Sequence, residues 1–241
     1  MTPRLLGTLG VAGAALAVLL IGAQHLVSPD VDPVRSTISA YGLGGFTPLF
    51  DGGVLALAAG SACVLAGGIR SGLIAARSVA AAGFATWIVA LVLVVAFEKV
   101  DWSVGATPSG LVHLYAGLVA FTVLPVAVLA LAVPGVRRGA TAARVSAGHA
   151  AADAGPEAVA GAVPARRAAG RGWAVAAVLA AVASVLWLSP FVIGVFSAPY
   201  TGVPWWRFVP IGLVQRGLAL TEVVAVVVIA LWVRAENARS A

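Results

Sequence analysis

Long runs of apolar residues, separated by short polar stretches, dominate the chain. A helix rises about 1.5 Å per residue, so about 20 apolar residues cross a bilayer core of roughly 30 Å. Six runs reach this length, and the chain shows no strand pattern. The pattern therefore predicts an all-α fold, a six-helix transmembrane bundle. The runs cover about 5–27, 47–69, 79–97, 111–133, 173–197 and 208–233.

Composition agrees with a bilayer as the solvent. Hydrophobic residues make up 61% of the 241 residues and charged residues 10%, with a mean hydropathy of +1.03. Soluble domains carry roughly 25% charged residues, and a water-soluble fold could not hide this much apolar surface. We therefore expect a single integral membrane domain over residues 1–241. The first run follows Arg4 as a signal peptide would, but it is long and lacks a clean cleavage site, so we expect a retained helix.

Basic residues are distributed unevenly among the connections. If the N-terminus is inside the cell, eleven arginines lie on the inner side, against Arg35, Lys99 and Arg207 on the outer side. Since cytoplasmic loops are enriched in Lys and Arg, this count predicts that both termini are cytoplasmic. An Ala-, Gly-, Val- and Arg-rich chain with one lysine favours a bacterial plasma membrane protein. The inner residues are Arg4, Arg70, Arg77, Arg137, Arg138, Arg144, Arg166, Arg167, Arg171, Arg234 and Arg239.

The one long connection covers residues 134–172. It is rich in Ala, Gly and Arg, lacks aromatic residues, and has few large apolar residues with which to build a core. We expect a flexible cytoplasmic loop there. Because topology explains the basic residues and no P-loop is present, nothing supports nucleic-acid binding. The partners that the sequence predicts are membrane lipids.

Ionisable groups gather at the outer ends of the predicted helices. His25 ends the first helix, Asp51 lies about one turn into the second, and His113 lies near the start of the fourth. Arg216 lies inside the last helix, where a charge is costly and usually has a partner. Arg216 and Asp51 have opposite charges and similar depth, so we expect them to pair, either as an interhelical clamp or as part of a site.

Three short motifs resemble a known family. They are "SPDVDPVRSTISAYG" after the first run, "TPSGLVH" at the fourth and "GLVQRG" at the last. The chain resembles, over about residues 8–233, the bacterial multi-pass membrane proteins catalogued as domain of unknown function 998. The resemblance implies a six-helix membrane protein without an established activity. It also matches Ser39, His113 and Arg216 to recurring Ser, His and Arg positions of that family, and the long linker is the main departure.

These residues support a first functional hypothesis, an outward-facing polar pocket that binds a lipid headgroup or a small anion. Arg216 would be the anion partner, Ser39 and His113 would form hydrogen bonds, and Asp51 would complete the ligand-binding set. The sequence leaves open which ligand is bound, whether the protein is an enzyme, and its oligomeric state.

Two alternatives remain at this point. In a zinc-dependent hydrolase acting at the outer leaflet, His25, Asp51 and His113 would be metal ligands, by analogy with the superfamily that includes alkaline ceramidases. That superfamily has seven helices and an H-x-x-x-H pair, whereas this chain has six predicted helices and Gly117 at the position four after His113. Zinc is the only cofactor considered. A small-solute transporter is the second alternative, supported only by Glu222 near mid-bilayer.

Overall fold

The fold consists of helices joined by short connections. A computed structural model describes residues 1–100, 105–152, 162–204, 207 and 209–237, and for 138–152 and 162–169 only their backbone. No strand occurs in the described residues. In order, the elements are α1 (Pro3–Val27), the 3-10 helix η1 (Ile38–Leu43), α2 (Thr47–Arg70), α3 (Val79–Ala96), α4 (Pro108–Ala152), α5 (Ala162–Thr201) and α6 (Ile211–Asn237).

All six α-helices contain a stretch long and apolar enough to span a membrane. The prediction of an all-α fold with six transmembrane helices is therefore confirmed. Local capping explains where two helices begin. The Thr2 hydroxyl, just before α1, accepts a hydrogen bond from the Leu5 N–H. The Ser78 hydroxyl, just before α3, accepts one from the Ala81 N–H at 3.1 Å. Both bonds satisfy amides that have no partner within the first helical turn.

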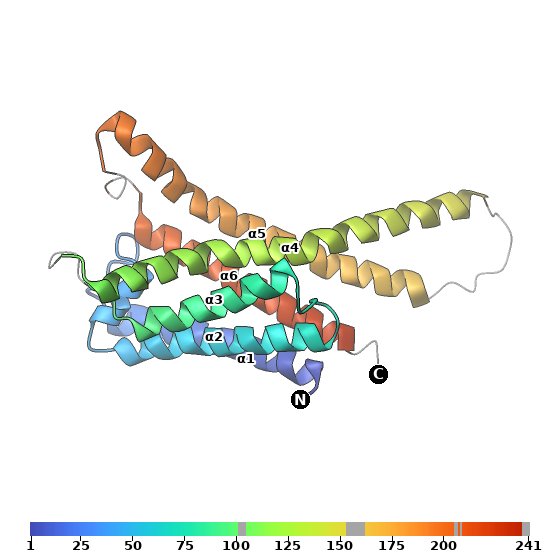
Figure 1. The fold of residues 1–241 in the computed structure, drawn as a ribbon, viewed down its shortest axis with the longest axis horizontal. Helices are drawn as coiled ribbons and strands as arrows, with labels where there is room; N and C mark the ends of the chain where they lie inside the picture. Colours follow the sequence, from blue (N-terminus) through green and yellow to red (C-terminus); the bar gives the residue numbers. More distant parts are fainter. Residues whose placement is uncertain (101–104, 153–161, 205–206, 208, 238–241) are drawn as a thin grey trace.

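The structure differs from the sequence prediction over residues 134–172. The sequence predicts a flexible loop there, but α4 continues to Ala152 and α5 begins at Ala162. These extensions form an arm that projects beyond the bundle (Figure 1). Residues 153–161, the middle of the predicted loop, lie outside the described residues. Alanine and arginine are among the best helix formers, so a segment too poor in large apolar residues to build a core can still be helical. The composition indicates that this segment cannot pack into a hydrophobic core, but it does not exclude a helix.

The connections divide between the two ends of the bundle. Both termini, the α2–α3 connection and the arm lie at one end, which we call the termini end (Figure 1). The connections after α1, α3 and α5 lie at the opposite end, which we call the loop end (Figure 1). The cytoplasmic location of the termini end stays a prediction that rests on the arginine distribution.

Glycines allow α1 to lie very close to its neighbours α2 and α6. A Cβ atom on Gly13 would lie 2.6 Å from the Ala56 carbonyl oxygen and 2.8 Å from the Gly60 Cα. A Cβ on Gly7 would lie 2.6 Å from the Ala230 carbonyl oxygen. Small residues permit such close backbone approach in lipid, where the hydrophobic effect does not drive helices together. The first helix therefore lies against both the second and the last.

Candidate functional site

The first loop, residues 28–46, folds back over the loop end of the bundle. The Asp32 carboxylate accepts the Val34 N–H at 2.8 Å and the Arg35 N–H at 3.3 Å, which forms an Asx turn. The Ser36 N–H donates to the Asp32 carbonyl at 2.8 Å. The chain then enters η1, which buries the Tyr41 side chain almost completely. This loop is thus an ordered cap on the bundle.

The start of α6 holds the first loop through its backbone. The Leu213 N–H donates to the Val34 carbonyl at 3.1 Å, and the Gln215 side chain accepts the Ile38 N–H at 3.1 Å. A Cβ on Gly212 would lie 2.4 Å from the Ser36 carbonyl oxygen, so only glycine permits this approach. Gly212, Leu213 and Gln215 of "GLVQRG" therefore all lie against the first loop.

Arg216 completes the attachment through its guanidinium group. Its Nε donates to His25 Nε2 at 2.9 Å, and its Nη2 donates to the Tyr41 hydroxyl at 3.1 Å. Its Nη1 donates to the Ser36 carbonyl at 2.8 Å and to the Gly212 carbonyl at 3.1 Å. We call Arg216 with His25, Ser36 and Tyr41 the arginine latch, because it joins α1, the first loop and α6.

Two aromatic rings orient the latch. The Arg216 Cζ lies 5.4 Å from the centroid of the Tyr41 ring, within the range of a cation–π contact. The His25 and Tyr41 ring centroids are 5.2 Å apart. His25 Nδ1 lies 3.0 Å from the Ile21 carbonyl, so Nδ1 carries the hydrogen and Nε2 accepts from Arg216. Both nitrogens of this imidazole are therefore engaged.

All four bonds of the Arg216 guanidinium go to uncharged acceptors, namely an imidazole, a phenol and two carbonyls. Within the described residues, no carboxylate pairs with it. Because a guanidinium has five N–H groups, one on Nη2 remains beyond these four bonds. The latch therefore carries a positive charge that its own partners do not neutralise.

The expected Arg216–Asp51 pair is wrong for the described structure. Asp51, on α2, interacts electrostatically with Glu98 and His113 instead. The sequence placed both residues at similar depth, but depth along a helix says nothing about which neighbour a side chain faces. The first loop reaches Arg216 and occupies its donors, whereas Asp51 interacts with Glu98, just after α3, and with His113 of α4.

The other predicted ligand residues lie in two places. The His113 side chain is 8% exposed, and its Nδ1 lies 2.9 Å from the Phe97 carbonyl. The Ser39 hydroxyl lies 3.3 Å from that of Thr37, which also accepts a bond from Lys99 Nζ. His113 and Asp51 thus form a group on α2 and α4, and Ser39 lies in a chain of hydroxyls ending at Lys99.

The described side chains do not support the proposed zinc set. No group of three or more His, Cys, Asp or Glu residues in the described part of the chain is arranged to hold a metal ion. His25 belongs to the arginine latch, whereas Asp51 and His113 interact with each other. The three residues are therefore not gathered into one set in the described structure, and the zinc hypothesis stays a prediction. The sequence showed that they lie at the same end but could not show their separation.

A small hollow lies beside the latch, where the first loop meets the segment ahead of α6. Its volume is about 80 Å³, and two arginines, Arg35 and Arg207, line it together with Val34, Val209 and Pro210. The hollow adjoins the beginning of α6, because Val34 is bonded to Leu213. Helix N-termini favour anions, so charge and backbone polarity agree here.

A match to a protein-family model shows which family the chain belongs to. A family model described as "Protein of unknown function (DUF998)" matches residues 11–232. The chain belongs to the DUF998 family. No curated protein and no solved structure matches the chain. The DUF998 match covers residues from α1, the first loop and α6, so it includes all four residues of the arginine latch.

Sequence reasoning on this DUF998 protein missed Tyr41, Gln215 and Gly212, which hold the latch together. A signal was present, because Gly212 and Gln215 precede Arg216 within a single short motif and Tyr41 lies near the end of the loop motif. The two motifs are 170 residues apart or more, so nothing in the sequence itself indicated that they meet. The hydrogen bond between His25 and Arg216 spans 191 positions.

Glu222 lies apart from the latch, inside the core. Its side chain is 1% exposed, and neither carboxyl oxygen has a hydrogen-bond partner. Residues one turn away on the same face, Leu218, Ala225 and Val226, are buried and apolar. The transporter hypothesis, which rests on this residue, stays a prediction.

Proposed function

We propose that this multi-pass membrane protein binds a phosphate-like oxyanion at its loop end, carried either by a lipid headgroup or by a free small anion. The observation that carries the proposal is the charge of Arg216, which is held among uncharged acceptors without a carboxylate partner in the described residues. Anions bind most strongly to guanidinium groups that are pre-oriented and not already neutralised.

The hollow next to the latch supplies the space for such an anion. Arg35 and Arg207 line it, and α6 begins at its edge. Two guanidinium groups with a helix N-terminus form a positive environment for an oxyanion. The arginine latch fixes the loop that carries Arg35, so it would orient the site as well as contribute charge.

The arginine distribution supports a location for this site on the outer face of a bacterial plasma membrane, with both termini cytoplasmic. The ligand would then arrive from the outer leaflet or from outside the cell. Of the predicted ligand residues, Arg216 holds the loop that lines the hollow, through its bond to the Ser36 carbonyl. Ser39 lies in the same loop, whereas Asp51 and His113 lie outside the lining of the hollow.

A binding experiment with matched variants tests this proposal. Detergent-purified protein is titrated with inorganic phosphate and, separately, with short-chain phosphatidylglycerol, and binding is followed by calorimetry. The Arg35→Gln/Arg207→Gln double variant leaves every bond of the latch intact. Because a hydrogen bond to a charged group contributes about 1.5–3 kcal/mol, we expect at least a tenfold loss of affinity. Arg4→Gln, at the termini end, is the control.

The two ligands separate the sources of the anion. A response to phosphate alone assigns the site to a free anion, and a response to the lipid alone assigns it to a headgroup. Unchanged affinity for both ligands in the double variant would contradict the proposal, as would an equal loss in Arg4→Gln.

A further inference from the structure

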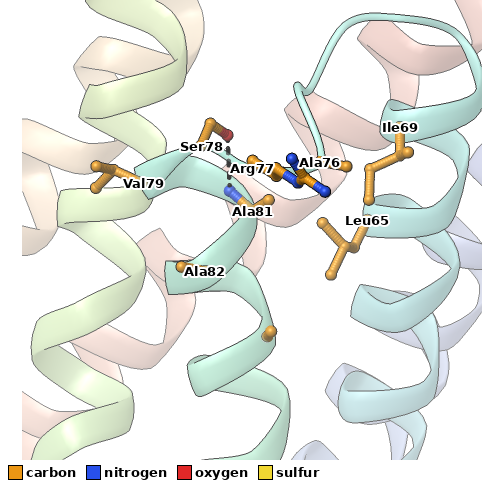
Figure 2. A pocket seen from close by; sticks show the side chains of 9 residues that line it. Leu65, Ile69, Ala76, Arg77, Ser78, Val79, Ala81 and Ala82 are labelled. Carbon is orange, nitrogen blue, oxygen red and sulfur yellow. Dashed lines mark hydrogen bonds between the residues drawn. The ribbon is translucent and has the colours of Figure 1, made fainter.

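An open groove runs between the last turns of α2 and the first turns of α3, at the termini end. Figure 2 shows the Arg77 side chain lying between these helices, near Ile69 and Leu65 of α2. The groove has a volume of about 510 Å³, within the roughly 300–1,000 Å³ typical of ligand sites. Residues that line it include Leu65, Ile69, Arg77, Val79, Ala82 and Ala85.

The groove exists because its two walls differ in side-chain size. Leu65 and Ile69 are one turn apart on α2, whereas Ala82 and Ala85 on α3 leave space opposite them. The short connection between the helices is fixed. Ile74 is buried against Gly68, and its N–H donates to the Gly68 carbonyl at 3.0 Å. The groove is thus held open by a packed turn.

Charge is confined to one end of the groove. Arg77 and Arg70 are exposed, and neither forms a hydrogen bond or ion pair with any described residue. Residues 52–97, which include most of α2 and all of α3, contain no Asp or Glu. Apart from Ser78, the rest of the lining is apolar, and all of it except Ala76 and Ser78 belongs to membrane-spanning helices. The groove therefore complements a molecule with one anionic head and a long apolar chain.

We propose that this groove binds an anionic phospholipid, with its phosphate at Arg77 and one acyl chain along Leu65, Ala82 and Ala85. A free anion would leave the apolar walls unfilled, and a zwitterionic lipid would not match the unpaired arginines. Basic pockets between transmembrane helices are known recognition sites for anionic headgroups. This site lies at the opposite end of the bundle from the oxyanion site and does not depend on it.

Two single substitutions separate the charge of the site from its shape. Arg77→Gln removes the charge and leaves the groove, whereas Ala85→Phe fills the groove and leaves the charge. The controls are Arg4→Gln, an exposed arginine at the same end, and Thr86→Phe, an exposed position beside Ala85 that does not line the groove. Each protein is incubated with equal amounts of phosphatidylglycerol and phosphatidylethanolamine, and retained lipid is counted by native mass spectrometry.

We expect the unsubstituted protein to retain phosphatidylglycerol preferentially. An arginine near an anionic surface contributes about 1 kcal/mol, so Arg77→Gln should lower the ratio of the two lipids about fivefold. Ala85→Phe should lower the total lipid retained, and both controls should behave like the unsubstituted protein. Loss of the outer oxyanion site in Arg35→Gln/Arg207→Gln should leave this preference unchanged.

Three results would overturn the proposal. One is an absence of lipid preference in the unsubstituted protein. Another is an equal fall of the ratio in Arg4→Gln, which would indicate diffuse attraction of lipid to the whole basic end. The third is full lipid retention in Ala85→Phe, which would place the acyl chain outside the groove. Thr86→Phe shows whether a large aromatic residue at this depth prevents folding.

Discussion

Arg216 and Glu222 are ionisable residues on one helix, and their surroundings differ completely. Arg216 has four hydrogen bonds to uncharged groups, whereas the Glu222 carboxyl has none. The sequence predicted that both lie within the membrane-spanning helix and that Arg216 has partners. It could not predict which partners, because a backbone carbonyl such as that of Ser36 has no signature in the sequence.

Glu222 gives a stability prediction at the residue scale. A buried polar group without a hydrogen bond costs about 1–3 kcal/mol, so Glu222→Leu should raise the free energy of unfolding by about that amount. Gln24 is the matched comparison, because it is equally buried but bonded to the Phe46 carbonyl and the Ser28 hydroxyl. Gln24→Leu should therefore destabilise the protein.

The measurement is chemical denaturation in detergent micelles, with circular dichroism as the signal. A loss of stability in Glu222→Leu as large as that in Gln24→Leu would show that Glu222 has a partner in the working protein. That result would revive the transporter hypothesis, for which this residue is the sole support.

At the scale of elements, hydropathy predicted the helices well and their mutual orientation poorly. α2 begins at residue 47 and α3 at residue 79, as expected, because an apolar run fixes the length and depth of a span. The rotation of each helix about its axis depends on packing contacts such as Gly13 against Gly60. Asp51 therefore lies close enough to His113 for their charges to interact, although its depth also suited Arg216.

The contact between the first loop and α6 gives a second prediction. Gly212→Ala would place a Cβ atom 2.4 Å from the Ser36 carbonyl oxygen, so the loop must move away from α6. Overpacking of this kind costs about 1–3 kcal/mol, and we expect a lower melting temperature together with weaker oxyanion binding.

Gly22→Ala is the control for this substitution. Gly22 lies in α1 with no atom near its missing Cβ, so alanine there should be neutral or slightly stabilising. If both variants melted at the temperature of the unsubstituted protein, the close approach of loop and helix would be absent in the membrane.

At the scale of the whole molecule, the two ends of the bundle have different chemistry. The loop end holds the latch and the hollow, and the termini end holds the groove with Arg70 and Arg77. The sequence separated these ends correctly, because alternate connections of a six-span protein must lie on opposite sides. It missed the helical arm, since helix propensity there acts without a hydrophobic pattern.

Sidedness is tested with single cysteines in a Cys63→Ser background. Gly44→Cys lies in the first loop and Ala75→Cys in the α2–α3 connection, and both positions are exposed. If the termini are cytoplasmic, a membrane-impermeant maleimide should label only Gly44→Cys in intact cells and both variants after permeabilisation. The reverse pattern in intact cells would invert the topology.

The arginine latch also has a consequence for biosynthesis. Its two sides are 191 positions apart, so α1 and the first loop leave the ribosome long before Arg216 of α6. Chains insert and fold from the N-terminus during synthesis. His25, the Ser36 carbonyl and the Tyr41 hydroxyl therefore wait at the membrane without their partner until α6 is inserted. The latch can therefore close only after α6 is inserted, and a product truncated before α6 would expose an unattached loop to quality-control proteases.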